Sequence, residues 1–155
     1  MPIRSSRKSE TYFDFFATSG NEAEAFDYDA PTAWYGNRGL FGGGSTPGVG
    51  NRNNIQYVTI TTTGNASDFG DRTEAKNGVT GCSGDGRGIF AGGSPGMSDV
   101  IDYVAIANTG NATDFGNLTA ARRNASSCSN GFRGIFVGGN PDTWTFSHFD
   151  YITIA

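Results

Sequence analysis

The chain of 155 residues is short enough for one domain, and its 24 glycines, beside only two leucines, exclude a helical bundle. The net charge of −4 is too small to hold the chain open by self-repulsion, so we expect a glycine-rich, all-β fold. The acidic balance and the dispersed Lys and Arg side chains argue against binding to nucleic acid, which requires clustered basic groups.

Residues 1–10 include the basic run IRSSRK, and we expect them to form a flexible N-terminal arm. No stretch of the chain approaches the roughly 20 consecutive apolar residues of a membrane-spanning helix. The first residues also lack the apolar segment of a secretory signal peptide. We therefore expect no membrane insertion and no export by that route.

Residues 11–155 are predicted to form a single repeat domain, because the sequence contains internal repeats. The segment TGNASDFG at 63–70 returns as TGNATDFG at 109–116. The same shift relates RGIFAGG at 87–93 to RGIFVGG at 133–139. Such long matches at one fixed distance indicate that a structural unit is repeated.

A shorter third copy lies upstream, where RGLFGGG stands at 38–44 and ATSGNEAEAF stands at 17–26. We place three repeats in the chain. Their approximate ranges are 11–54, 55–100 and 101–155.

Each repeat is predicted to contain four short strands separated by Gly, Asn and Asp. In IDYVAIA at 101–107 both alternating faces are largely apolar, so we expect this strand to be covered on both sides. The remaining two strands are expected within 113–131, broken near Asn117 and at Asn130-Gly131. The other predicted strands are IQYVTIT at 55–61, RGIFAGG at 87–93, RGIFVGG at 133–139 and FDYITIA at 149–155.

The order of a glycine pair, a tyrosine-bearing strand, an aromatic residue, an arginine and a second glycine pair resembles a kelch repeat. The residues concerned are Gly92-Gly93, Tyr103, Phe115, Arg122 and Gly138-Gly139. A phenylalanine stands where kelch repeats carry tryptophan, and its distance from the tyrosine exceeds the kelch spacing. The resemblance implies three four-stranded blades of a kelch-like β-propeller. A three-fold β prism or trefoil remains an alternative for a chain of this length.

The wording TGNATDFGNLTAAR, followed by RGIFVGG, is also similar to repeats of virion-associated proteins in marine bacteriophages. This resemblance implies a virion structural protein of the tail or capsid, assembled in the host cytoplasm. The leading hypothesis is a non-enzymatic interaction module that associates with itself and docks to other virion proteins. The alternative is a receptor-binding tail appendage that recognises host surface glycans.

Three blades would leave two uncovered flanks, because closed propellers usually contain four to eight blades. We therefore expect a homo-oligomer, with a dimer completing a six-bladed ring about a two-fold axis, or a permanent contact with another virion protein. TYFDFFA at 11–17 occupies the repeat position of FDYITIA at 149–155. This surplus strand either pairs with a blade edge of the next subunit or completes its own first blade.

Residues that suit catalysis are few. The single histidine, His148, excludes a multi-histidine metal site, and no catalytic triad or cofactor motif is visible. We expect no enzyme activity, no cofactor and no bound metal. Cys82 and Cys128 stand at equivalent repeat positions, so we expect each to fill the same small buried niche.

Charged residues that recur with the repeat are predicted to be structural. Asp68 and Asp114 are expected to bond local backbone N–H groups and to fix a turn. Arg38, Arg87 and Arg133 are expected to pair with a carboxylate or a carbonyl of the adjacent blade.

Aromatic residues outside the repeat pattern are the candidates for binding a partner protein or a glycan, because loop aromatics give large contact areas. Trp144 has an alternative role, capping the exposed end of the last blade. The candidates are Trp34, Tyr35, Trp144, Phe146 and His148.

Overall fold

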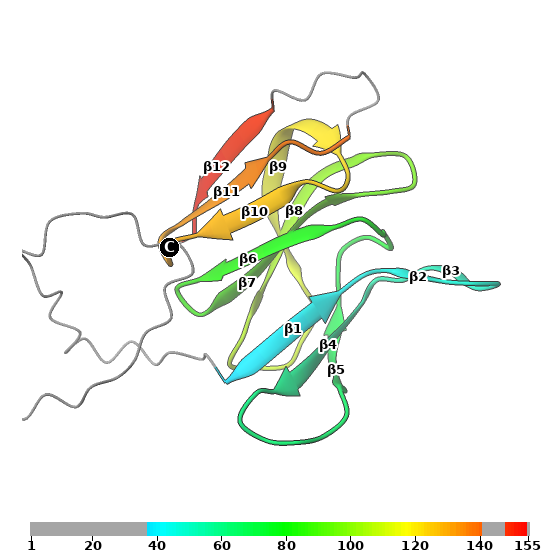
Figure 1. Cartoon of the computed structure of the whole chain (residues 1–155), viewed down its shortest axis with the longest axis vertical. Helices are drawn as coiled ribbons and strands as arrows, with labels where there is room; N and C mark the ends of the chain where they lie inside the picture. Colours follow the sequence, from blue (N-terminus) through cyan, green and yellow to red (C-terminus); the bar gives the residue numbers. More distant parts are fainter. Residues whose placement is uncertain (1–36, 141–147, 155) are drawn as a thin grey trace, which may run out of the picture. The chain divides into compact units, whose positions relative to one another are not determined.

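The computed structural model describes residues 37–140 and 148–154 of the chain. These residues form twelve β-strands and no helix, and the strands make three small antiparallel sheets and one short hairpin. Figure 1 shows the three sheets following one another in chain order. The predicted all-β fold is confirmed.

Sheet 1 contains three strands in the order β1-β4-β5. A hairpin of β2 (Ser45–Thr46) and β3 (Gly50–Asn51) lies between the first two of these strands in the chain. The strands of sheet 1 are β1 (Arg38–Gly42), β4 (Asn54–Thr59) and β5 (Ser67–Asp71).

Sheet 2 contains four strands that pair in chain order. Its first two strands lie in the predicted repeat 55–100 and its last strand lies in the predicted repeat 101–155, so the sheet does not coincide with one predicted repeat. They are β6 (Thr80–Gly84), β7 (Arg87–Gly93), β8 (Ser98–Ala105) and β9 (Thr113–Arg122).

Sheet 3 pairs three strands in the order β10-β11-β12. They are β10 (Ser126–Ser129), β11 (Arg133–Val137) and β12 (Phe149–Thr153).

The predicted break near Asn117 is wrong, because β9 runs through this residue without interruption. Asn117 lies opposite Val100 of β8, so it takes part in the sheet. The chain turns further on, where Asn124 has a φ of 54°. The second predicted turn, at Asn130-Gly131, does separate β10 from β11.

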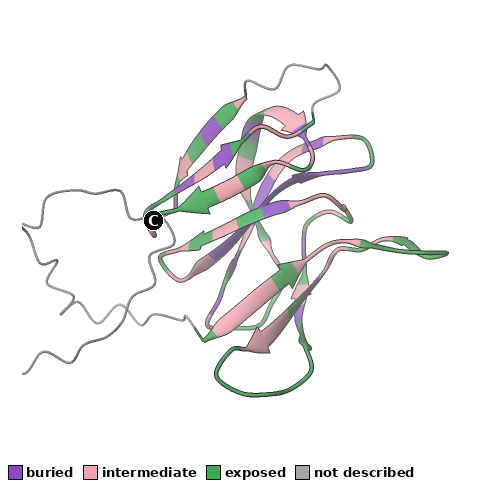
Figure 2. Ribbon diagram, in the orientation of Figure 1, coloured by how far each residue is buried: buried purple, intermediate pink, exposed green. Residues whose placement is uncertain are grey.

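Sheet 2 is buried on both faces, as the apolar pattern of its third strand predicted. Ile101 of β8 belongs to a cluster shared with sheet 3, whereas Val104 belongs to a cluster shared with sheet 1. Figure 2 shows the buried residues concentrated on β7 and β8. The core therefore consists of two layers, one on each side of the middle sheet.

The glycine pair at the end of β7 allows a close approach between strands. Gly92 has a φ of 68°, and a Cβ atom there would lie 2.4 Å from the backbone oxygen of Arg122. Gly138 occupies the equivalent repeat position with a φ of 67°, but no atom of a described residue lies within 4 Å of the position that a Cβ atom would take there. The two glycines share a left-handed backbone conformation, which suits glycine, and they differ in their described surroundings.

This difference predicts unequal costs for the same substitution. Gly138→Ala should lower the free energy of unfolding by about 1–2 kcal/mol, the cost of a left-handed conformation for an L-residue. Gly92→Ala should lower it by about 3 kcal/mol or more, because the clash with Arg122 is added. Urea unfolding of the two variants measures both values, and equal losses would contradict the close approach at Gly92.

Candidate interaction surface

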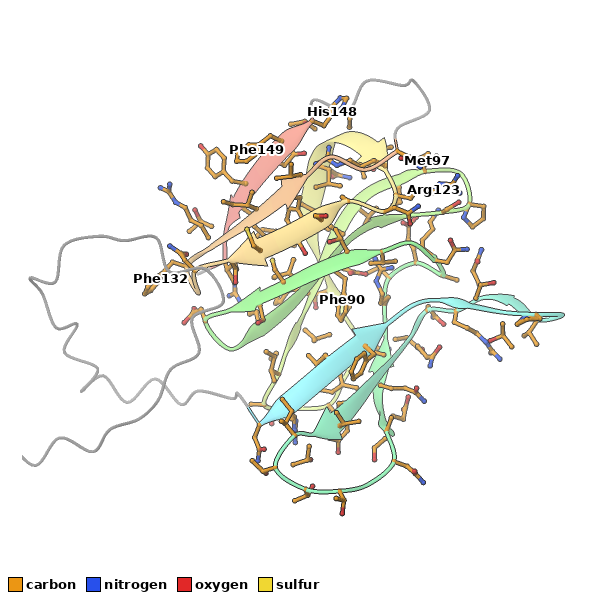
Figure 3. The ribbon with its side chains drawn as sticks, viewed as in Figure 1. Phe90, Met97, Arg123, Phe132, His148 and Phe149 are labelled. Carbon is orange, nitrogen blue, oxygen red and sulfur yellow. The ribbon has the colours of Figure 1, made fainter. Side chains whose placement is uncertain are left out.

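The contacts between consecutive sheets repeat along the chain. Between sheets 1 and 2, Ile55 and Phe69 pack against Phe90 and Val104. Phe90 projects from sheet 2 toward β1 in Figure 3, where Gly42 leaves room for its ring.

The contact between sheets 2 and 3 uses the same repeat positions. Ile101 stands where Ile55 stands in sheet 1, and it packs in one cluster with Phe136, the counterpart of Phe90. Ile154 completes this second cluster. Sheets 2 and 3 therefore each insert a phenylalanine toward the sheet before them.

Arginines connect each sheet to the next one through backbone carbonyls. Arg38 of sheet 1 donates from Nη1 to the oxygens of Ile106 and Ala107, at 2.7 and 2.9 Å. Arg87 of sheet 2 donates in the same way to the oxygen of Ile154, at 2.6 Å. These are carbonyl partners in the adjacent sheet, of the kind that the repeat predicted for this arginine position.

The same arginines stack on tyrosines of their own sheets. Arg38 lies 4.8 Å from the ring centre of Tyr57, and Arg87 lies 4.9 Å from that of Tyr103. Arg133 of sheet 3 stacks on Tyr151 at 5.6 Å. Its side chain is exposed, and it donates no hydrogen bond to another described residue.

A buried carboxylate also links each pair of sheets. Asp102 of β8 accepts a hydrogen bond from Arg72 Nε at 3.2 Å, and it accepts two more from the backbone and hydroxyl of Thr73. Both charged side chains of this pair are fully buried. In such a position a lone charge is strongly destabilising, so the two residues stabilise the fold only as a pair.

Asp150 of β12 occupies the same repeat position as Asp102. It pairs with Arg122 and accepts a hydrogen bond from the backbone N–H of Thr119 at 3.0 Å. Burial alone would raise the pKa of this carboxyl, but the hydrogen bonds from Thr119 and Arg122 and the charge of Arg122 outweigh it. The pKa of Asp150 is therefore lowered from its ordinary value.

The sequence did not identify Asp102 and Asp150 as structural residues. Their signal was the Asp-Tyr dipeptide shared by two of the predicted strands. The aspartates that it did identify, Asp68 and Asp114, are exposed and form no side-chain hydrogen bond with another described residue. The neighbouring Asn111 instead accepts a hydrogen bond from the backbone N–H of Asp71, at 3.0 Å across the two sheets.

The two cysteines do not fill equivalent buried niches. Cys82 is half-buried, and burial together with the nearby Cys128 raises the pKa of its thiol to about 11. Its Sγ atom lies 2.8 Å from the position that a Cβ atom would take on Gly134 of the next sheet. Cys128 is exposed. The prediction is wrong for Cys128, because no further described sheet covers sheet 3.

Four of the five aromatic or histidine candidates, Trp34, Tyr35, Trp144 and Phe146, lie outside the described residues. His148 is described, and it is half-buried immediately before β12. Its carbonyl accepts a hydrogen bond from the backbone N–H of Gly138, so it helps to join β11 and β12.

The outer face of sheet 1 exposes apolar residues whose counterparts are buried. Ile60 is 63% exposed, whereas Ile106 and Ile154 at the same repeat position are 9% and 0% exposed. Phe41 is likewise exposed, and it lies opposite Gln56 in the strand pairing, so both project from the same face. We call this face, made of Gly39, Phe41, Gln56, Val58 and Ile60, the leading face.

The outer face of sheet 3 shows the same reversal. Phe149 is 58% exposed, whereas Ile55 and Ile101 at its repeat position are 0% and 1% exposed. Figure 3 shows Phe149 on the side of β12 that is turned away from sheet 2. We call this the trailing face; it consists of Cys128, Arg133, Ile135, Val137, Phe149 and Tyr151.

The two outer faces expose large apolar side chains, among them Phe41 and Phe149. Within 37–140 and 148–154, no three His, Cys, Asp or Glu residues come together as a metal site would require. No helix in this part is long and apolar enough to cross a membrane. The sequence matches no protein-family model and no curated protein.

The buried ion pair between sheets 1 and 2 predicts a large effect of one substitution. Asp102→Ala should lower the free energy of unfolding by about 3–5 kcal/mol, because it leaves Arg72 buried and unpaired. Asp68→Ala is the matched control, since Asp68 is exposed, and it should change stability by less than about 0.5 kcal/mol. Chemical unfolding measures both, and similar values would contradict a role for the pair.

The second ion pair predicts a pH dependence. The pKa of Asp150 is lower in the folded chain than in the unfolded chain, so the ionised carboxylate adds stability above the ordinary pKa of about 3.9. That contribution is lost as the pH falls through the folded-state pKa. The difference in unfolding free energy between the wild type and Asp150→Asn should be full at pH 7 and should shrink below about pH 4. A difference independent of pH would refute this assignment.

Proposed function

We propose that the chain is a non-enzymatic structural and interaction module, built of kelch-like blades, which associates through its two outer faces. The observation that carries this proposal is that apolar residues are exposed on those faces, whereas the residues at the same repeat positions in the other sheets are buried. Ile60 on the leading face and Phe149 on the trailing face are exposed, although their repeat counterparts are buried between sheets. Exposed apolar groups of this kind mark a surface that binds a protein.

The proposal assigns one blade to each sheet. Sheet 2 has four antiparallel strands in chain order, the arrangement of a propeller blade. Each blade buries its faces only against neighbours, so three blades in a row keep two faces open. A second copy would cover both faces and complete a six-bladed ring.

The energy of covering these faces favours association. Burial of one large aliphatic or aromatic side chain stabilises a complex by about 1.5–3 kcal/mol. Six exposed large apolar side chains lie on sheets 1 and 3 or on the turns that border their strands. They are Phe41, Ile60, Phe132, Val137, Phe149 and Tyr151.

The setting that we propose is a bacteriophage particle. The support is the resemblance of TGNATDFGNLTAAR and RGIFVGG to repeats of virion-associated phage proteins. In this setting the module is assembled in the host cytoplasm and docks, in the tail or the capsid, to other virion proteins.

Self-association predicts a molar mass of twice the 16.3 kDa of the chain. Sedimentation equilibrium or light scattering of the purified chain at micromolar concentration measures this mass. A stable monomer under these conditions would overturn association with itself.

The exposed isoleucine of the leading face predicts a selective effect. Ile60→Asp should weaken association by about 10-fold to 100-fold, because it removes about 1.5–3 kcal/mol of burial. Val49→Asp is the matched control, since Val49 is equally exposed at 63% but lies in the turn of the β2–β3 hairpin. Association should be unchanged in this control, and an equal loss in both variants would point to a general charge effect instead.

A further inference from the structure

We infer that the trailing face of one copy binds the leading face of a second copy, head to tail, in the register of the internal sheet junctions. This inference rests on the proposed self-association and adds which residues meet. Its basis is that the outer faces carry complementary halves of three contacts seen at the internal junctions: the arginine-to-carbonyl hydrogen bond, the apolar packing and the cysteine–glycine approach.

The first unpaired half is a hydrogen-bond donor. Arg38 and Arg87 each donate to a carbonyl in the following sheet. Arg133 stands at the same repeat position, and the described residues provide no carbonyl for it. It is exposed on the trailing face and already stacked on Tyr151, the tyrosine of its own sheet.

The matching acceptor lies on the leading face. The carbonyl of Ile60 occupies the repeat position of the Ile106 and Ile154 carbonyls, which accept from Arg38 and Arg87. No described residue donates to the Ile60 carbonyl.

The Ile60 carbonyl is also held in the same turn as its two counterparts. In sheet 1, the backbone N–H of Ile60 donates to the oxygen of Asn37. In sheets 2 and 3, Ile106 and Ile154 donate to the oxygens of Gly86 and Phe132 at the equivalent positions. The acceptor is therefore pre-positioned for Arg133 of another copy.

The apolar side chains complement one another in the same way. At the internal junctions, Phe90 and Phe136 insert toward the sheet before them, next to Ile55 and Ile101. Phe41 is the exposed counterpart of the two phenylalanines. The receiving positions on the trailing face are Phe149 and Tyr151, both exposed.

A cysteine and a glycine provide the third complementary pair. At the junction of sheets 2 and 3, the thiol of Cys82 lies against Gly134. It fits there because glycine has no Cβ atom. Cys128 is the exposed counterpart of Cys82 on the trailing face. Gly39 is the counterpart of Gly134, and the described atoms nearest to a Cβ atom there would be those of Val58 and Phe41 of its own sheet, at 3.4 Å and beyond.

The charge of the leading face also suits burial. Asp102 and Asp150 need arginine partners at the internal junctions. Gln56 stands at their repeat position on the leading face, and it is exposed and uncharged. Covering this face therefore buries no unpaired carboxylate. Burial of an unpaired carboxylate would cost several kcal/mol.

These pairs favour a head-to-tail arrangement over contact between two like faces. Two trailing faces would bring Arg133 against Arg133, and two leading faces would bring two carbonyl acceptors together without a donor. Each face is complementary to the other face and not to itself. Such an interface closes into a ring when the rotation permits it.

Cysteine cross-linking tests this register in the full chain. Gly39→Cys should form a disulfide with Cys128 of a second copy when diamide is supplied as the oxidant, giving a linked dimer on non-reducing gels. Adding Cys128→Ser should abolish the link. Gly134→Cys is the positive control, because the 2.8 Å approach of Cys82 places the two sulfurs within bonding reach inside one chain.

The outcomes separate the register from the association itself. A chain that has the dimer mass in light scattering, but does not link through Gly39→Cys while the Gly134→Cys control closes, overturns the head-to-tail register and leaves self-association standing. A chain that remains monomeric overturns both.

Mixing two one-sided variants gives an independent test. Ile60→Asp blocks the leading face, and Phe149→Asp blocks the trailing face. Both residues are exposed in the single chain, so neither substitution places a charge in its core. Each variant alone should associate about 10-fold to 100-fold more weakly than the wild type, so it should be monomeric at a concentration just above the wild-type dissociation constant. At that concentration an equimolar mixture should form dimers with one copy of each. Dimers of either variant alone, or a mixture that stays monomeric, would overturn the inference.

Discussion

Each of the three larger sheets in the described part of the chain has two largely apolar faces, and this constraint governs the rest of that structure. A strand such as β8 presents Ile101 to one side and Val104 to the other, so neither face of its sheet can remain in water without cost. Sheets 1 and 3 stack on the two sides of sheet 2 and so remove both of its apolar faces from water. The same solution leaves large apolar side chains exposed on the two outermost described faces, and the proposed association would bury them.

Polar contacts give this stacking its register. Apolar burial is non-directional, but the arginine-to-carbonyl hydrogen bonds and the buried Asp–Arg pairs fix how far one sheet slides along the next. In the proposed assembly the same contacts would select the partner of each outer face. Among the described residues Arg133 has no carbonyl acceptor and the Ile60 carbonyl has no donor.

The sequence predicted the features that depend on local patterning. Short runs of β-branched and aromatic residues bounded by Gly, Asn and Asp identified the strands around Tyr57, Tyr103 and Tyr151, and recurrence of RGIF identified the arginines that join adjacent sheets. It failed where a property depends on neighbours in space. Cys82 and Cys128 look alike in the sequence, and only the position of their sheets makes one half-buried and the other exposed. Likewise, Asn117 suggested a break between strands, but β9 continues through it to Arg122, and only the register of its pairing with β8 shifts between these two residues.

The central claim, that another copy covers the outer faces, is tested most directly by the chemical reactivity of Cys128. In a Cys82→Ala variant this residue is the sole thiol of the chain. Its rate of alkylation should be high in dilute solution and should fall as the chain concentration rises through the range in which the mass doubles. A rate that stays high while the mass doubles would show that the trailing face remains open, and it would contradict the account.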